Sequence, residues 1–141
     1  MSSASAVAVA AVFVWLGMVL AISFIEAPLK FRAPGVTLQI GLGIGRLVFR
    51  ALNGTELLLA AVLAVAVVVD PPSTCATASA AVAVITLLAQ VLIVRPRLTK
   101  RSDAVLAGDE GPRSHAHYVY VGFEVVKVAA LLIAGVLLLT A

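Results

Sequence analysis

Six charged residues lie inside stretches of the sequence that are otherwise apolar, and they are the first candidates for chemistry. Three are acids and three are bases, so that their formal charges cancel: Glu26, Arg46, Arg50, Glu56, Glu124 and Lys127. A charge at the centre of a bilayer costs about 2.5–3.5 kcal/mol on insertion scales, so such side chains face the bundle interior and pair with one another. They are expected either to bind a ligand or couple a proton, or to form ion pairs that only fix helix packing.

The spacing of the polar residues places them on single faces of helices, because residues three, four, seven and ten apart share one side. One such set comprises Arg46, Arg50, Asn53 and either Glu56 or Leu57. A second comprises His117, Tyr120, Glu124 and Lys127. Two smaller sets are Ser79, Thr86, Gln90 and Arg97 in one helix and Ser23 with Glu26 in another.

Counting from the helix ends, we expect these faces to converge in one half of the bundle. The depths predict two ion pairs, Glu56 with Lys127 and Arg50 with Glu124. The other half is almost purely apolar, which predicts a vestibule open to the cytoplasm and closed outside. The candidates for ligand binding or proton coupling are Glu26, Arg46, Arg50, Asn53, Glu56, Gln90, His117, Tyr120, Glu124 and Lys127.

The elements that position these residues follow from the composition. The 141 residues are 62% hydrophobic and 12% charged, with a mean hydropathy of +1.15, whereas soluble domains carry roughly 25% charged residues. This excludes an ordinary soluble enzyme, a nucleic-acid-binding protein and a disordered chain. The apolar runs predict an all-α, four-helix membrane bundle in a single transmembrane domain, with spans at about 4–27, 45–69, 74–94 and 117–140.

The basic residues predict which side of the membrane each connection faces. Connections 28–44 and 95–114 contain seven of them, whereas the N-terminus, segment 70–73 and the C-terminus contain none. The positive-inside rule therefore places both connections in the cytoplasm and both termini on the other side of a bacterial inner (plasma) membrane. We expect segment 28–44 to lie along the interface, and Pro96 to end the third helix before a solvated loop.

Several chemistries lack the residues that they need. The only histidines, His115 and His117, are two positions apart and cannot ligate one haem iron from opposite faces. No metal-binding pair of the Glu-x-x-His or His-x-x-x-His type occurs, and Cys75 is the only cysteine. No nucleophile lies beside a base in a known pattern. The sequence therefore predicts no catalytic residue, no metal and no cofactor.

Short motifs in the first two spans carry a resemblance to a family. They are Trp15-Leu-Gly17, Glu26-Ala-Pro28-Leu-Lys-Phe31, Gly45-Arg46-Leu-Val-Phe49 and Asn53, together with His117 opening the last span. In these the chain resembles small four-helix membrane proteins of the TMEM205-like, DUF4149 type. The resemblance implies the four-helix architecture but no particular activity, and Glu124 and Lys127 fall outside its pattern.

Taken together, the sequence predicts a protein that binds or transports a small or amphipathic solute through its polar cluster. The alternative is a non-catalytic accessory or structural membrane subunit, whose buried ion pairs only fix helix packing. The expected partners are membrane lipids, a small amphipathic ligand, and a second copy of the chain or another membrane protein, with no nucleic acid.

Overall fold

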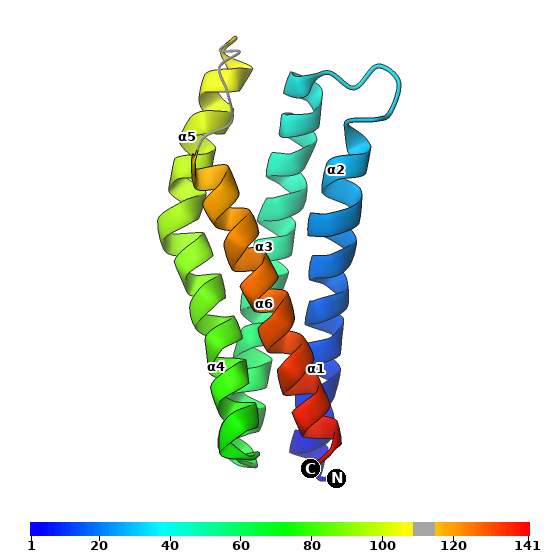
Figure 1. Cartoon of the computed structure of the whole chain (residues 1–141), viewed down its shortest axis with the longest axis vertical. Coiled ribbons are helices and arrows are strands. Elements are labelled where there is room, and N and C mark those ends of the chain that lie inside the picture. Colours follow the sequence, from blue (N-terminus) through cyan, green and yellow to red (C-terminus); the bar gives the residue numbers. More distant parts are fainter. Residues whose placement is uncertain (109–114) are drawn as a thin grey trace.

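Four helical rods, each long and apolar enough to cross a membrane, make up the computed structural model, which describes residues 1–108 and 115–141 (Figure 1). They span Ser3–Lys30, Leu38–Val69, Thr74–Leu106 and His117–Leu139. No strand occurs in the described parts of the chain. The predicted all-α fold with four membrane-length helices is therefore confirmed.

Two of the rods change their helical geometry on the way. The first consists of α1 (Ser3–Val19), the π-helix η1 (Leu20–Glu26) and α2 (Ala27–Lys30). The third consists of α4 (Thr74–Ala89), the π-helix η2 (Gln90–Val94) and α5 (Arg95–Leu106). The second rod is the single helix α3 (Leu38–Val69), and the fourth is α6 (His115–Leu139).

A proline follows each π-helical segment, Pro28 after η1 and Pro96 after η2. A proline lacks the N–H that an α-helix needs, and its ring clashes with the carbonyl group four residues earlier. The wider π-helical turn relieves this clash, so the helix continues past the proline. The prediction that the third helix ends at Pro96 is therefore wrong: α5 continues to Leu106. Of the predicted loop 95–114, residues 109–114 lie outside the described residues.

Polar side chains cap three of the helices. Ser2, Thr37 and Ser73 each accept a hydrogen bond from the backbone N–H three residues further on, at 3.0, 3.2 and 3.2 Å. In the turn before α3, Gly35 adopts φ +82°, which suits glycine. The second span begins at Leu38 rather than near residue 45, because Thr37 caps it and glycines at its start do not interrupt it.

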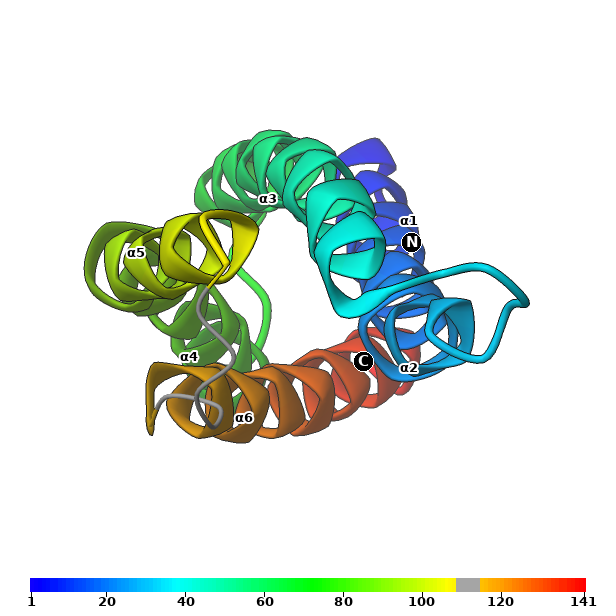
Figure 2. The same ribbon diagram turned by 90° about the horizontal axis from the view of Figure 1, so that it is seen from above.

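The four rods form a ring in the order α1, α3, α4 and α6, with α6 closing against α1 (Figure 2). Of the neighbouring pairs, α3 and α4 make the fewest contacts. Both termini lie at the same end of the bundle as the turn between α3 and α4 (Figure 1). That half of the bundle is filled by an apolar cluster that includes Val12, Leu63, Leu87 and Leu131.

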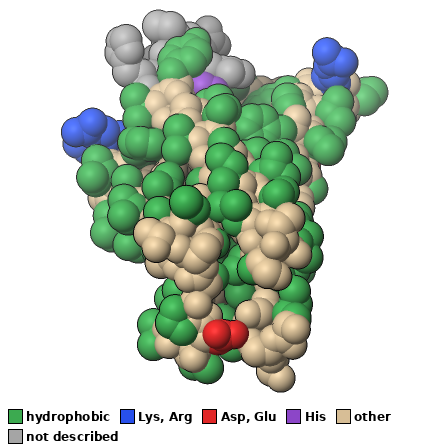
Figure 3. Space-filling model, turned by 60° about the horizontal axis from the view of Figure 1, so that its bottom comes forward, with side chains coloured by type: hydrophobic (Ala, Val, Ile, Leu, Met, Phe, Trp, Pro, Cys, Tyr) green, Lys and Arg blue, Asp and Glu red, His purple; other side chains and the backbone are tan. Residues whose placement is uncertain are grey.

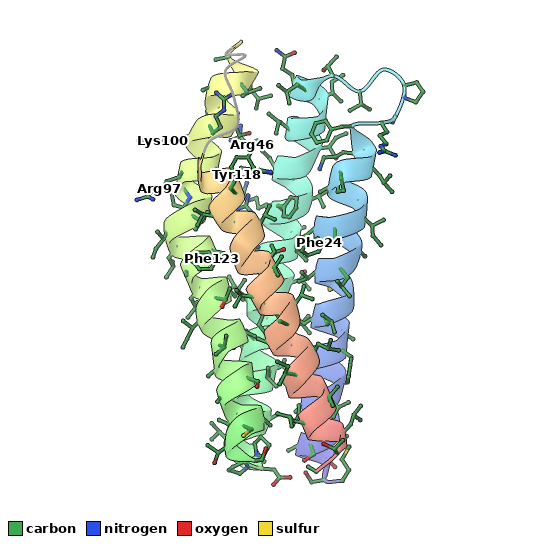
Figure 4. All side chains as sticks on the ribbon, in the orientation of Figure 1. Phe24, Arg46, Arg97, Lys100, Tyr118 and Phe123 are labelled. Carbon is green, nitrogen blue, oxygen red and sulfur yellow. The ribbon has the colours of Figure 1, made fainter. Side chains whose placement is uncertain are left out.

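Charge is distributed unevenly between the two ends. On the face in Figure 3, side chains are mostly hydrophobic, with one acidic patch near the bottom end and Lys or Arg only towards the opposite end. Figure 4 labels Arg97 and Lys100, which point outward from α5 in the upper half. The termini and the basic residues thus occupy opposite ends of the bundle, as the sequence predicts, whichever side of a membrane each end faces.

Candidate functional site

A buried ion-pair cluster lies near the middle of the bundle, centred on the ammonium group of Lys127. Its Nζ lies 2.5 Å from Glu56 Oε2 on α3 and 2.6 Å from Glu124 Oε1, one turn earlier on α6. It also donates a hydrogen bond to Gln90 Oε1 at 2.8 Å. The side chains of Lys127 and Glu56 are fully buried. Since an ammonium group has three donors, all of them are occupied.

The two carboxylates of this cluster are also satisfied by neutral donors. Glu56 accepts hydrogen bonds from Trp15 Nε1 at 2.7 Å and from Asn53 Nδ2 at 3.0 Å. Glu124 accepts from Gln90 Nε2 at 2.9 Å and from Ser23 Oγ at 2.5 Å. Every carboxylate oxygen therefore has at least one partner, which is what a buried charge requires.

Both π-helices contribute to this cluster. Ser23 lies in η1 and Gln90 is the first residue of η2, and both bind Glu124. π-helical turns are often found at functional sites. Their positions here coincide with the level of the ion pairs, because the prolines just beyond them place the wider turns there.

A second polar layer covers the cluster on the side of the basic end. Asn53 donates to the Tyr120 hydroxyl at 3.2 Å and accepts from Arg95 at 3.0 Å. The Arg95 guanidinium lies 4.8 Å from the Tyr120 ring and 5.5 Å from the Phe49 ring, in cation–π contact with both. Arg95 thereby brings a positive charge close to a cluster whose formal charge, with two carboxylates and one ammonium, is −1.

A cleft of about 430 Å³ opens above this layer, between the first rod, α3, α5 and α6. We call it the central cleft. Ser23, Tyr120 and Glu124 lie at its inner end. Its basic lining residues are Lys30, Arg46, Arg95, Arg101 and His117, and its apolar ones include Phe24, Phe31, Leu42, Phe49 and Val121.

The ten candidate residues from the sequence fall into two groups. Six lie together in the buried cluster and its covering layer: Asn53, Glu56, Gln90, Tyr120, Glu124 and Lys127. The predicted pair Glu56–Lys127 is confirmed. The predicted pair Arg50–Glu124 is wrong, because Glu124 is bound to Lys127, Gln90 and Ser23, while Arg50 is exposed on another side of α3.

The other four candidates lie outside the buried cluster. Glu26 lies 3.8 Å from Lys30, and Arg46 forms an ion pair with Asp103 of α5 at 2.8 Å. His117 lines the central cleft. The sequence leaves open whether Glu56 or Leu57 continues the polar face of α3. In the structure Glu56 faces the core, whereas Leu57 lines a groove with Arg46 and Arg50.

Three residues of the site, Trp15, Ser23 and Arg95, are not among the ten candidates. The sequence places Trp15 only in a family motif, Ser23 only on a polar helix face and Arg95 only in a loop. The signal for Trp15 was available, because a lone indole N–H inside a membrane span needs an acceptor, and Trp15 and Ser23 are eight positions apart, on one helix face. No signal identified Arg95, because its place in the site depends on the helix continuing past Pro96.

Among the described residues, no group of three or more His, Cys, Asp or Glu side chains could hold a metal ion. The described site consists of ion pairs, hydrogen bonds and an open, basic-lined cleft. The chain matches no protein-family model, no curated protein and no solved structure.

Proposed function

We propose that the protein binds a small amphipathic organic anion in the central cleft. The observation that carries the proposal is the lining of the cleft: four Lys or Arg side chains and one histidine surround it, against one glutamate, with aromatic and aliphatic walls between them. Its volume of about 430 Å³ lies in the range of roughly 300–1,000 Å³ typical of small-molecule sites.

The charges around the cleft favour an anion even after the ion pairs between described residues are counted. Glu26 offsets Lys30, and Asp103 offsets Arg46. Among the described residues, Arg95 donates a hydrogen bond only to the neutral Asn53, and its Nε has no partner. An anionic group near Arg95 would therefore gain charge-assisted hydrogen bonds without displacing a carboxylate from that residue.

The buried cluster provides the inner end of the site rather than the binding group. All three donors of Lys127 are used within the protein, so a ligand does not need to reach it. The same saturation favours the alternative function, an accessory or structural subunit in which the ion pairs only fix helix packing. The two functions differ in whether the cleft takes up a ligand.

We further propose that the basic end faces the cytoplasm, with both termini outside, in a bacterial inner membrane. The support is the positive-inside rule applied to the basic connections. The short motifs around Trp15 and Gly45 support a relationship to the TMEM205-like, DUF4149 type. Transport of the bound anion and a homo-oligomeric assembly are the remaining parts of the proposal.

Photolabelling tests the binding function. The probe is a ten-carbon carboxylate that carries a diazirine at its far end, and the ten-carbon alcohol with the same diazirine is its uncharged counterpart. With the protein in lipid nanodiscs, the carboxylate should label peptides of the cleft walls, and excess unlabelled decanoate should suppress this labelling. The alcohol should label them several-fold less.

A pair of variants on α6 provides the control. Val121→Phe adds a ring inside the cleft, whereas Val125→Phe adds the same ring at a lipid-exposed position outside it. We expect Val121→Phe to reduce labelling at least fivefold and Val125→Phe to leave it unchanged. Equal labelling of the two variants, or of the carboxylate and the alcohol, would contradict anion binding and favour the accessory function.

A further inference from the structure

A second opening, which we call the lateral groove, lies on the outside of the bundle between α3 and the rod formed by α4, η2 and α5. Its volume is about 540 Å³. It follows the seam where neighbouring rods make the fewest contacts. It shares Arg46, Arg95, Leu98 and Ser102 with the central cleft, while Arg50, Leu57 and Val91 belong to the groove alone.

Two polar atoms of the groove lining are buried without a hydrogen-bond partner. Ser102 is only 9% exposed, yet its Oγ has no hydrogen-bond partner. Arg95 Nε is buried without a partner as well. Arg50 takes part in none of the ion pairs between described residues. A buried hydroxyl without a partner destabilises the folded protein, and a ligand that supplies an acceptor would remove this cost.

The groove is lined by three guanidinium groups and the hydroxyl of Ser102, a combination that suits a phosphate group in particular. The guanidinium groups are those of Arg46, Arg50 and Arg95. Arginine presents a planar fork of donors that matches two phosphate oxygens at once. A phosphate also offers further oxygens for a neighbouring hydroxyl. Asp103 occupies part of Arg46 at 2.8 Å, but Arg50 and the Nε of Arg95 remain for the ligand.

The apolar lining continues from these donors towards the middle of the bundle. Leu57 is seven residues beyond Arg50 on α3, which corresponds to about 10 Å along the helix axis. Leu57 is 39% exposed, and Val91 forms the facing wall. In a bilayer, a groove with donors near the headgroups and aliphatic side chains below them matches the shape of a lipid.

We propose that the lateral groove binds the phosphate group of an anionic membrane lipid at Arg50, Arg95 and Ser102, with an acyl chain against Leu57 and Val91. This site goes beyond the proposed anion site of the central cleft. It shares Arg95 and Ser102 with the cleft, but Arg50, Leu57 and Val91 belong to the groove alone, and the lipid reaches it from the side.

Native mass spectrometry of the detergent-purified protein tests the proposal by titration with dioleoyl phosphatidic acid. Dioleoylglycerol has the same acyl chains without the phosphate, and inorganic phosphate has no chains. We expect phosphatidic acid to bind at least tenfold more tightly than either. Equal binding of dioleoylglycerol would overturn the role of the phosphate, and equal binding of inorganic phosphate would overturn the role of the acyl chain.

Matched arginine variants locate the site. Arg50→Gln removes a charge from the groove, whereas Arg97→Gln removes one from an exposed position that lines neither opening. We expect the first to weaken phosphatidic acid binding five- to tenfold and the second to leave it unchanged. Ser102→Ala should weaken it about threefold. Equal affinities for the Arg50 and Arg97 variants would overturn the proposal.

The two proposals fail separately in these experiments. Val121→Phe alters the central cleft and leaves the lateral groove intact, so it should not change phosphatidic acid binding. Arg50→Gln should likewise leave photolabelling of the cleft by the ten-carbon carboxylate unchanged. If either variant lost both the photolabelling of the cleft and the binding of phosphatidic acid, the two openings would form one continuous site. That result would overturn the assignment of the lipid to a separate groove.

Discussion

Replacing Lys127 by methionine removes the one positive charge at the centre of the buried cluster. Its ammonium lies 2.5 and 2.6 Å from two carboxylate oxygens on different helices. Coulomb's law with an effective dielectric constant of about 20 gives roughly 6–7 kcal/mol of attraction for each pair, before desolvation is subtracted. Removing one member of a buried pair typically costs about 3–5 kcal/mol. We expect Lys127→Met to lower the free energy of unfolding by about 4 kcal/mol.

The opposite single variant, Glu56→Gln, should cost less. It leaves the Glu124–Lys127 pair intact, because both residues lie on α6. The single oxygen of the glutamine can still accept from Trp15 and Lys127, but the Nδ2 of Asn53 then faces the amide nitrogen of the glutamine instead of an acceptor. One buried donor without a partner costs about 1–3 kcal/mol, so we expect a loss of about 2 kcal/mol.

The double variant distinguishes coupling from simple addition. With Glu56 neutral and Lys127 gone, the remaining carboxylate of Glu124 keeps its hydrogen bonds from Gln90 and Ser23. We therefore expect a total loss of about 4 kcal/mol, whereas independent effects would give about 6. The expected coupling of about 2 kcal/mol lies within the range of residues in direct contact.

Unfolding in mixed micelles, with an increasing fraction of sodium dodecyl sulfate, measures these energies. Trp15 is the only tryptophan and donates to Glu56, so its fluorescence reports on the cluster itself. Lys100→Met, at an exposed position on α5, is the matched control and should change stability by less than about 0.5 kcal/mol. Additivity of the Lys127 and Glu56 variants within about 0.5 kcal/mol would refute the reasoning.

Three further predictions test other parts of the structure. Trp15→Phe removes the indole donor to Glu56 and should cost about 2 kcal/mol, measured by circular dichroism because no tryptophan remains; no loss would mean that this hydrogen bond is not formed. Gly135→Ala places a Cβ 2.7 Å from the Phe13 ring, whereas Gly122→Ala on the same helix meets nothing within 4 Å. The first should be less stable than the second by about 1–3 kcal/mol in micelle unfolding, and equal stabilities would contradict the α1–α6 packing. Hydrogen bonds from Ser2 and Ser5 hold the pKa of Asp70 below its ordinary value of 3.8. The stabilisation is therefore present above pH 3.8 and lost as the pH falls through the lowered pKa. The protection of amides at the start of α1, relative to their intrinsic exchange rates, should decrease only below pH 3.8, and Asp70→Asn should abolish this dependence.

The architecture was predictable because membrane spans leave a strong signal. Long apolar runs, with polar residues spaced so that they share one helix face, can be recognised without knowing which helices pack together. The pair Glu56–Lys127 followed from depth alone, since few charges lie at that level. The face of α6 that carries Tyr120, Glu124 and Lys127 was also predictable, because residues four and three positions apart lie on the same side of an α-helix.

The parts that were not predictable depend on how helices contact one another. Whether Arg50 or Lys127 binds Glu124 depends on the rotation of α3, and the sequence allows the face through Leu57 as well as the one through Glu56. The continuation of α5 past Pro96 depends on a π-helical turn, for which the sequence has no distinct pattern. Arg95 entered the site only through that continuation.

The distribution of contacts in the cluster limits how the protein could release or carry a ligand. Glu124 and Lys127 lie on α6, and Asn53 and Glu56 lie on α3, so each helix retains a local polar pair if the two separate. Only the bonds between α3 and α6 would break, namely the ion pair of Glu56 with Lys127 and the hydrogen bond from Asn53 to Tyr120. Beyond the cluster, apolar side chains fill the bundle. If the central cleft binds the proposed anion, the cluster closes its inner end, and carriage across the membrane would require α3 and α6 to move apart at the cluster.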